Sequence, residues 1–409
     1  MNRPDGLHLL SHIADIDAAR WDALLDASSA AAPPGLRHAY LATLEDTGCV
    51  GGRTGWKPAH ATLWQRGEPI AAMPLYLKDH SYGEYVFDWA WAQAYDRHGL
   101  DYYPKWLSAV PFTPIPGARI LGGDLPARQA LLDAVLAKVR GSGCSSFHVL
   151  FPADDEVPLL ASAGMMVRKG VQFHWQNRPG TIAGEATGTR YPPAWGAKHG
   201  DACWTDFDAF LASLNSEKRK KIRQERRRAA AHGLELRWLD GHDARAEHWD
   251  FLGRCYAMTY ALHRSTPYLS TAFFHRLAER MPDAVRLLLA CRDGQPIAAA
   301  FFLCDEKALY GRYWGALENL PFLHFELCYY QAIAYCITHG LERFEGGAQG
   351  EHKLARGLTP VRTHSAHWIA DPRFRRAVDD YLARERDGME GYVDELNERS
   401  PFRRNAAGG

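Results

Sequence analysis

The sequence predicts a mixed α/β protein in which two similarly built domains follow one another. At 409 residues the chain is longer than one hydrophobic core usually organises. Hydrophobic residues make up 46% and charged residues 23%, as in ordinary globular proteins. The third observation is an internal repeat, in which residues 66–77 recur as residues 292–303 with matching Gly, Pro, Ile, Ala and Ala at one offset. A repeat of this kind indicates duplicated structural units.

Each copy of the repeat predicts a β-hairpin. An apolar run leads into a turn that contains Gly67 or Gly294, and a second apolar run follows. An aromatic segment comes next in each half, at 85–91 and at 309–314. Both segments are long enough for a third antiparallel strand.

Helical patterns surround the strands in the same order in both halves. Apolar residues at helical spacing predict two helices before each hairpin and one after the third strand. A short strand and a final strand complete each half. The predicted helices are 17–27, 39–47 and 128–140 in the first half and 247–263, 271–281 and 324–339 in the second; the closing strands are 146–151 with 171–177, and 342–345 with 361–369.

This order is typical of the GNAT fold, so the predicted fold class is α/β (α+β) with two tandem GNAT-like domains, each a mixed, mostly antiparallel sheet flanked by helices. We expect the first domain at 1–178, with a Tyr/Trp/Pro-rich insertion at 92–124. A Gly/Thr/Pro-rich linker at 179–203 follows. The second domain, 204–409, is expected to open with a basic helix at 215–231.

Composition argues against several other classes of protein. Lys plus Arg (48) balance Asp plus Glu (48), so no global field draws the chain to nucleic acid or anionic lipid. The eight cysteines form no CxxC pair and no cluster at zinc-ligand spacing, which predicts reduced core residues and no metal. No apolar stretch has the length of a signal peptide core or a membrane span. We therefore expect a cytoplasmic protein.

Four segments resemble the FemAB-like peptidoglycan biosynthesis and recognition family, whose members are tandem GNAT-fold acyltransferases. The segments are Tyr-Tyr-Pro-Lys-Trp-Leu-Ser-Ala-Val-Pro-Phe-Thr-Pro (102–114), Gly-Val-Gln-Phe-His-Trp-Gln-Asn (170–177), the basic run 217–228, and Phe-Glu-Gly-Gly-Ala-Gln-Gly-Glu-His-Lys-Leu-Ala-Arg-Gly (344–357). The resemblance spans most of the chain. It implies transfer of an acyl or aminoacyl group to an amine. In the better understood relatives the donor is aminoacyl-tRNA and the amine belongs to a peptidoglycan precursor.

The segment 345–356 is the leading candidate for chemistry. Its glycines, among them Gly347 and Gly350, can turn N–H groups inward as an anion nest, with Gln349, Lys353 and Arg356 as further ligands. Glu345, Glu351 and His352 are the candidate bases for an attacking amine, and the sequence does not choose among them. A Gly-rich turn with solvated charges is the plainer alternative.

Substrate contacts are expected from two further places. Arg312, Tyr313 and Trp314 lie in the third strand of the second domain, where an aromatic wall for the donor is one interpretation and ordinary sheet packing is the other. Lys105 lies in the insertion, which is either a rim over an acceptor groove or a packed loop. Glu326 at a helix start is explained by the helix dipole alone.

The basic run from Asn215 to Arg228 holds eight basic and two acidic residues. As a helix it is a candidate contact for tRNA phosphates, although such runs are more often solvated faces. The stretch 315–324 lacks the glycines that hold the acetyl-CoA pyrophosphate in GNAT domains, which disfavours that cofactor.

Three functions remain open from the sequence. The leading one is an N-acyltransferase or aminoacyltransferase acting on an amine. The second is an acyl-CoA-dependent acetyltransferase with an atypical cofactor loop. The third is a recognition module without catalysis on the same scaffold.

Overall fold

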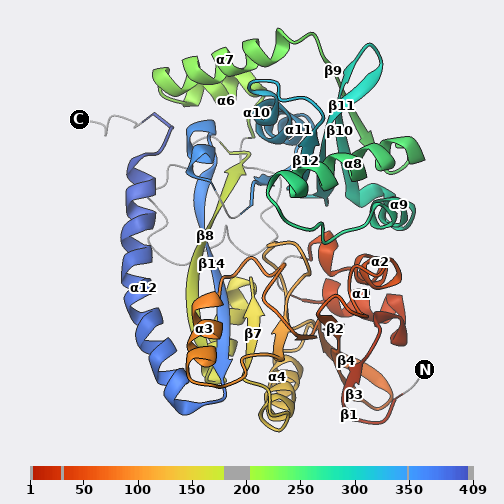
Figure 1. Ribbon diagram of the computed structural model, residues 1–409, viewed down its shortest axis with the longest axis vertical. Helices are drawn as coiled ribbons and strands as arrows, with labels where there is room; N and C mark the ends of the chain where they lie inside the picture. The colour runs from red at the N-terminus through yellow and green to blue at the C-terminus, as the bar shows by residue number, and fades with distance from the viewer. Residues whose placement is uncertain (1–2, 29–31, 179–202, 348–349, 404–409) are drawn as a thin grey trace. The chain divides into compact units, whose positions relative to one another are not determined.

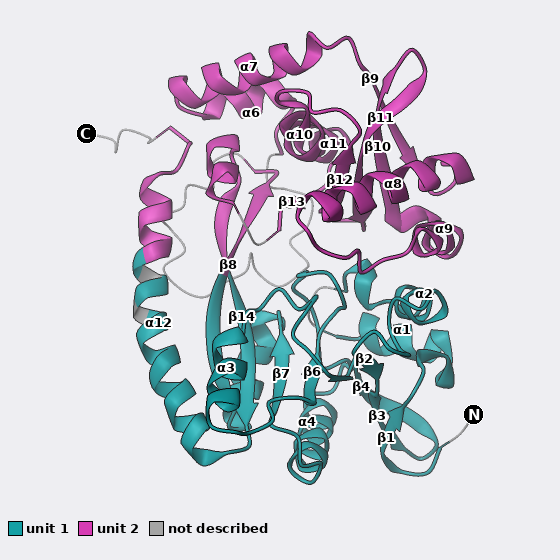
Figure 2. Cartoon of the chain, in the orientation of Figure 1, with its two compact units in different colours: residues 1–170, 191–196, 362–391 teal, residues 171–190, 197–361, 392–409 magenta. Residues whose placement is uncertain are grey.

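The computed structural model describes residues 3–28, 32–178, 203–347 and 350–403. The described chain divides into two compact units, shown in Figure 2. Unit 1 comprises the chain up to Gly170 together with Arg362–Gly391, and unit 2 comprises Val171 to Val361 together with the segment from Tyr392 onward. The expected linker, 179–203, lies outside the described residues except for Cys203.

Unit 1 contains a three-stranded sheet of order β1-β3-β4 and a second set of strands of order β2-β5-β6-β7-β14. Its elements, of which Figure 1 labels the larger ones, are β1 (Gly6–Leu10), η1 (Ile13–Asp15), α1 (Ala18–Asp26), η2 (Pro34–Leu36), α2 (His38–Asp46), β2 (Trp56–Pro58), β3 (His60–Gln65), β4 (Glu68–Met73), β5 (Tyr76–Lys78), α3 (Trp89–Arg97), β6 (Lys105–Ser108), α4 (Leu125–Arg140), β7 (Ser146–Leu150), η3 (Asp154–Glu156) and α5 (Val157–Ser162). Helix α4 packs against these strands through Leu131, Val135 and Val139.

Unit 2 is built on a sheet of order β8-β13-β12-β11-β10-β9 with helices on both faces. Its elements are α6 (Phe207–Ser213), α7 (Ser216–Ala230), β9 (Glu235–Asp240), α8 (Ala246–Leu262), α9 (Thr271–Arg280), η4 (Pro282–Ala284), β10 (Val285–Arg292), β11 (Gln295–Cys304), β12 (Ala308–Ala316), α10 (Leu323–Phe325), the π-helical turn η5 (Glu326–Tyr330), α11 (Gln331–Thr338), β13 (Arg343–Glu345) and η6 (Glu351–Arg356). The unit boundary falls inside β8 (Met166–Gln176), β14 (Thr359–Ile369) and α12 (Pro372–Glu398).

The repeated segment forms the same hairpin in both units, as predicted. The turn residues Arg66 and Gly67 have φ of 54° and 78°, and Asp293 and Gly294 have φ of 50° and 78°. Two residues with positive φ fit a tight turn that matches the twist of a hairpin. Both hairpins also carry a β-bulge one residue after the proline, where Ile70 or Ile297 is the extra residue. The duplication thus extends to backbone geometry.

The third strand of the first half is not at 85–91, where it was expected. Residues 89–97 form α3, in which Trp91 and Tyr95 are buried at helical spacing among alanines. The strand that takes this place is β6, inside the segment read as an insertion. Leu107 of β6 pairs in parallel with His148 of β7, as Tyr310 of β12 pairs with Glu345 of β13.

The units also differ from the consecutive segments 1–178 and 204–409 expected from the sequence. Strand β14 pairs with β7, since His367 lies opposite His148, so residues 362–391 belong to unit 1. Strand pairing between segments far apart in the chain cannot be read from local patterns. None of the helices in the described part of the chain combines the length and apolar character that crossing a bilayer requires.

Helix capping follows the sequence closely. The side chain of Asp17 caps α1, Asn215 caps α7, and Ser270 caps α9 by accepting a bond from a backbone N–H in the first turn. The helix expected at 324–339 is divided into α10, the π-helical turn and α11. Such π-turns occur most often at functional sites.

Candidate functional site

The carboxyl end of β13 and the middle of β12 form the frame of the candidate site in unit 2. The parallel pairing of the two strands ends at Tyr310 and Glu345. Two residues later the register of β12 with β11 shifts, and Arg312 is the extra residue of a β-bulge. Bulges re-aim side chains beside active sites, and ligands often bind at the carboxyl ends of parallel strands. Arg312 therefore lies just beyond Tyr310, the last residue of β12 that pairs with β13.

Glu345 is buried at this strand end and lies in a group of charged side chains. One carboxylate oxygen accepts from Nε of Arg343 at 2.9 Å, and the other, Oε2, is buried without a partner. His174 is its neighbour across the β8–β13 pair. Burial lowers the pKa of His174 to about 4, and Glu345, Arg343, Arg312 and Lys353 all act on it electrostatically. These five groups therefore share one neighbourhood.

The glycine segment after Glu345 is bound back to β8. The N–H of Gly346 donates to the carbonyl of Phe173, and the carbonyl of Gly347 accepts from the N–H of Phe173. The N–H of Gly346 is consequently not available for an anion nest. Gly347 and Gly350 have φ of 82° and 103°, in the region that favours glycine. The segment acts as a tight connection that brings Lys353 back to the strand end.

Lys353 is a buried cation without a carboxylate partner. Its side chain is 5% exposed, and Nζ donates to the carbonyl of Gly347 at 3.4 Å. Burial, followed by the nearby charge of Arg312, lowers the pKa of Lys353 to about 8. In the described chain neither Arg312 nor Lys353 forms an ion pair, and Nε of Arg312 is buried without a hydrogen bond. Two adjacent cations without an anion are costly unless a ligand supplies one.

The π-helical turn provides a further side of this neighbourhood. Tyr329 is buried, and its hydroxyl lies 3.1 Å from Nε2 of His352. The ring of His352 also packs beside Phe325. Burial, together with Arg356 and Lys353, lowers the pKa of His352, so its neutral form is favoured. A neutral imidazole can accept a proton.

Arg356 holds the η6 segment in place. Its guanidinium donates to both carboxylate oxygens of Glu225 at 3.0 and 2.9 Å and lies 3.4 Å from the centre of the Phe325 ring. It also donates to the carbonyl of His352. Tyr330 donates to the same Glu225 carboxylate. With its two terminal nitrogens engaged in this way, and Nε buried without a hydrogen bond, Arg356 positions the segment, which differs from the direct ligand contact expected from the sequence.

Other predicted residues lie apart from this group. The carboxylate of Glu351 is exposed and bound by Tyr392 and Arg399 of the C-terminal segment. Tyr313 stacks on Phe301 and touches helices α8 and α9, whereas Trp314 packs against His324. The two aromatic rings therefore do not form one wall. Gln349 lies outside the described residues.

Lys105 does not lie on an exposed rim. It is the first residue of β6, is 0% exposed, and forms ion pairs with Glu84 and Asp88 of unit 1. The other three residues of β6 are also buried. The segment read as an insertion therefore contributes a buried strand to unit 1.

The basic run forms α7, as predicted, and its buried side is Ile222, Glu225 and Ala229. Arg226 makes a double contact with Glu326 at 3.2 to 3.3 Å, so an ion pair, in addition to any dipole effect, explains that carboxylate. Lys220, Lys221 and Arg227 are exposed. The helix thus joins a basic surface to the η6 segment through Glu225.

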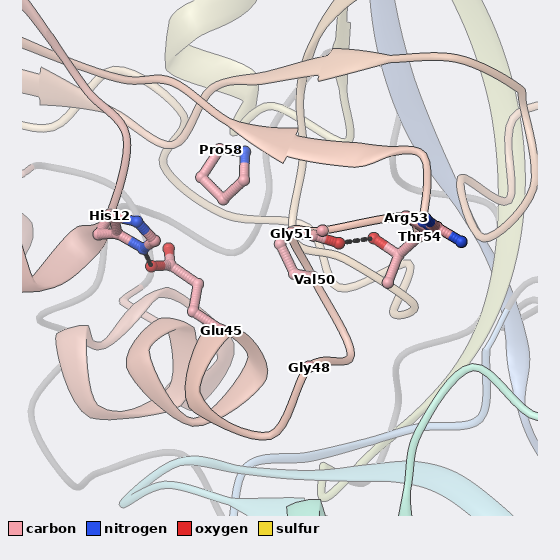
Figure 3. A pocket seen from close by; sticks show the side chains of 9 residues that line it. His12, Glu45, Gly48, Val50, Gly51, Arg53, Thr54 and Pro58 are labelled. Atoms are coloured by element: carbon pink, nitrogen blue, oxygen red, sulfur yellow. Dashed lines mark hydrogen bonds and ion pairs between the residues drawn. The ribbon is translucent and has the colours of Figure 1, made fainter.

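A pocket of about 500 Å³ lies elsewhere, in unit 1 (Figure 3). It is lined by His12, Glu45, Pro58 and the glycine-containing loop from Gly48 to Thr54. The carboxylate of Glu45 accepts from the N–H of Ile13 and contacts His12 and His60. Its oxygens already have polar partners within the unit. The pocket contains none of the predicted site residues.

Sequence reasoning missed His174, Arg343, Tyr329 and Glu225. Each acquires its role from a neighbour distant in the chain, as when Glu225 meets Arg356. One signal was present in the sequence: His-Trp occurs in both closing strands, at 174–175 and at 367–368. Both histidines occupy the same place in the sheet, opposite Glu345 and His148 respectively.

Comparison with known proteins gives a family and a fold. A family model described as FemAB-like, peptidoglycan biosynthesis/recognition, matches residues 12–181 and 197–404. No curated protein matches the chain. The chain is similar to FemX, with 11% identity, a TM-score of 0.51, and coverage of 89% of this chain and 98% of that one. It is also similar to L-PGS from Bacillus licheniformis, with 9% identity, a TM-score of 0.50, and coverage of 87% and 92%. At these identities the likeness shows the shared fold, and it agrees with two tandem GNAT-like units.

Proposed function

We propose that this chain, which belongs to the FemAB-like family of peptidoglycan biosynthesis and recognition, is an acyltransferase that moves an acyl or aminoacyl group onto an amine. The reaction centre of this proposal lies in unit 2, around Glu345, Arg312 and Lys353. The observation that carries it is that Arg312 and Lys353 form no ion pair in the described chain, although they lie near the buried carboxylate of Glu345, which has one oxygen without a hydrogen bond.

Each group has a role in amide formation. The lone pair of the acceptor amine attacks the donor carbonyl, and the carbonyl oxygen becomes an oxyanion. Arg312 and Lys353 stabilise that negative charge, which is the interaction that gains most strength in the transition state. The attacking nitrogen loses a proton to Glu345 or His352, and the leaving oxygen or sulfur of the donor takes a proton as the carbonyl re-forms. No covalent intermediate on the protein is needed.

The donor class that we favour is aminoacyl-tRNA, with an amine of a peptidoglycan precursor as acceptor. Family membership and the exposed cations of α7 support this choice. Phosphates of tRNA would bind the exposed side of α7, while its ion pair to Arg356 connects that helix to the η6 segment. The stretch 315–324, which has only one glycine, argues against an ordinary acetyl-CoA site.

A two-donor transfer assay tests the proposal. Bulk aminoacyl-tRNA with a radiolabelled amino acid, and in parallel radiolabelled acetyl-CoA, are each incubated with the full chain and an amine-bearing peptidoglycan precursor. We expect label to move from aminoacyl-tRNA to the precursor, and Lys353→Met to lower the transfer rate about 100- to 1,000-fold. Transfer from acetyl-CoA alone would assign the second function, an acyl-CoA-dependent enzyme.

The non-catalytic alternative has its own outcome in the same experiment. If neither donor is used, and the triple variant E345Q/E351Q/H352A retains precursor binding in native mass spectrometry, the chain is a recognition module and the proposal is wrong. Tyr313→Phe is the control variant for transfer and for precursor binding. Both should stay unchanged in it, because the ring of Tyr313 lies in the aromatic packing around Phe301.

A further inference from the structure

Two buried lysines face each other in unit 1. Lys78 of β5 and Lys105 of β6 are direct partners in the antiparallel register, and both are 0% exposed. Like charges at opposite positions destabilise a sheet, and each buried cation requires compensation. The sheet itself offers none at this place, so the compensation must come from another segment.

One segment, residues 80–88, supplies the acceptors for both ammonium groups. Nζ of Lys105 donates to Oγ of Ser81 at 2.7 Å, to Glu84 at 2.8 Å and to Asp88. Nζ of Lys78 lies 3.2 Å from Nδ1 of His80 and 3.4 Å from the carbonyl oxygen of Tyr82. The segment contains no helix or strand. It is bound to the sheet through these polar contacts.

The carboxylates of this segment do not serve its own backbone. Asp88 is the N-cap residue of α3, yet its side chain makes no cap hydrogen bond. It contacts Lys105 and the hydroxyl of Tyr102 instead. One oxygen of Asp88 and one of Glu84 are buried without partners. A side-chain cap stabilises the start of a helix, so a carboxylate diverted from it indicates a requirement at Lys105.

The outer side of the segment is unusually apolar for an exposed loop. Tyr82 and Phe87 are 55% and 57% exposed. Tyr85 has φ of 62°, a conformation that bulky residues seldom adopt. Exposed apolar side chains and local backbone strain fit a segment that opens more readily than the sheet beneath it.

Lys78 and Lys105, together with Glu84 and Asp88, form a cluster in which the two lysines are unequally compensated. Lys105 contacts two carboxylates, whereas Lys78 forms no ion pair with any described carboxylate and lies 3.9 Å from the centre of the Trp56 ring. Burial lowers the pKa of Lys78 to about 7. A ligand that brought carboxylates to both ammonium groups would match the cluster better than the segment does.

We propose that Lys78 and Lys105 form a carboxylate-binding site in unit 1, which Glu84 and Asp88 occupy from within. Its ligand is a small molecule or peptide end that carries two neighbouring carboxylates. On binding, the ligand replaces the two internal carboxylates at the ammonium groups, and residues 80–88 move outward. The site does not depend on the proposed transferase activity, and its test reads binding alone.

Calorimetric titration of the full chain with glutarate, a simple dicarboxylate, tests the site. Glu84→Gln removes one internal competitor and leaves Asp88 on Lys105, so we expect it to bind glutarate at least about tenfold more tightly than the unchanged protein. Adding Lys78→Met to that variant should abolish the gain. Dimethyl glutarate, which has no charge, should not bind.

A matched control separates loss of a competitor from general loosening. Glu156→Gln removes another buried carboxylate of unit 1, one that pairs with Arg128 and receives backbone N–H groups. It should gain no affinity for glutarate. An equal gain in this control, or a gain that persists with Lys78→Met, would overturn the proposal.

Hydrogen exchange on the unchanged protein covers the case in which Glu84→Gln fails to fold. The unchanged protein is measured with and without glutarate, at about ten times the highest glutarate concentration of the titration. With glutarate present, backbone amides of residues 80–88 should exchange faster than without it. Amides of β6 should not change. Unchanged exchange across 80–88, or binding absent in both proteins, means that the cluster is a closed structural network and the inference is wrong.

Discussion

Two equivalent strand ends, one in each unit, carry different chemistry. In unit 1 the position opposite Leu107 is His148, and in unit 2 the position opposite Tyr310 is Glu345. Across the next strand pair lie His367 and His174. The sheet positions correspond, but the side chains differ.

In unit 1 the polar groups at this place satisfy one another. Nδ1 of His148 lies 2.7 Å from Nδ1 of His367, and Ser146 and Ser365 contact the two outer nitrogens. Burial lowers the pKa of both histidines, which keeps them neutral. In the same unit, Lys105 forms ion pairs with the carboxylates of Glu84 and Asp88.

In unit 2 the corresponding neighbourhood contains charged groups that have no ion-pair partner in the described chain. Arg312 and Lys353 form no ion pair within the described chain, and Glu345 has a free oxygen. Buried polar groups without partners reduce stability, and proteins retain such costs mainly at functional sites. The comparison indicates that duplication kept the frame, while the two histidines at this place in unit 1 satisfy each other and the corresponding place in unit 2 is the proposed reaction centre.

The largest expected effect tests how far Lys105 stabilises the buried carboxylates of unit 1. Lys105→Met leaves Glu84 and Asp88 buried without their shared cation, which should lower the free energy of unfolding by about 3–5 kcal/mol. Urea unfolding measures it. Lys353→Met is the matched change in unit 2, and since Lys353 has no ion pair it should cost less than about 1 kcal/mol. Equal losses would remove the distinction between the units.

The next effect concerns the rate of transfer. Lys353→Met should lower kcat of the transfer reaction about 100- to 1,000-fold, because one donor to the developing oxyanion is lost. KM for the acceptor should change much less. A stable variant of normal rate would show that Lys353 is not part of the reaction centre.

The pH dependence sharpens the role of Lys353. Burial and Arg312 lower its pKa to about 8, so the ammonium is present below pH 8 and is lost as the pH rises through that value. At pH 9 about one tenth remains charged, and oxyanion stabilisation should fall about tenfold. Arginine stays charged, so the rate of Lys353→Arg relative to the unchanged protein should rise about tenfold between pH 7 and pH 9. A flat ratio would contradict the assignment.

The smallest effect tests the shared frame. Gly67→Ala and Gly294→Ala each force alanine to a φ of 78°, which should cost about 1 kcal/mol in either unit. A Cβ at position 294 meets no atom within 4 Å, so the cost there comes from the backbone alone. Thermal unfolding of the two variants should give similar losses. Unequal values would mean that the hairpins are alike in shape only.

Much of the fold could be predicted from neighbouring residues. The hairpins and the capped helices α1, α7 and α9 depend on contacts within a few residues, which local sequence specifies. Segment 85–91 was misread, because aromatic residues are enriched in strands, whereas Trp91 and Tyr95 are buried at helical spacing in α3. The sequence selected Glu345 and Lys353 as candidates because glycines and charges after a strand mark a strand exit.

What the sequence by itself determined is therefore the repeated frame and the segment that carries the polar groups. Only the tertiary structure decided which charges are compensated. Glu225 meets Arg356 across 131 positions, and Lys105 meets Glu84 and Asp88 across 21 and 17. Ion pairs form between side chains a few ångströms apart in space, and strand register and packing, rather than spacing along the chain, set those distances.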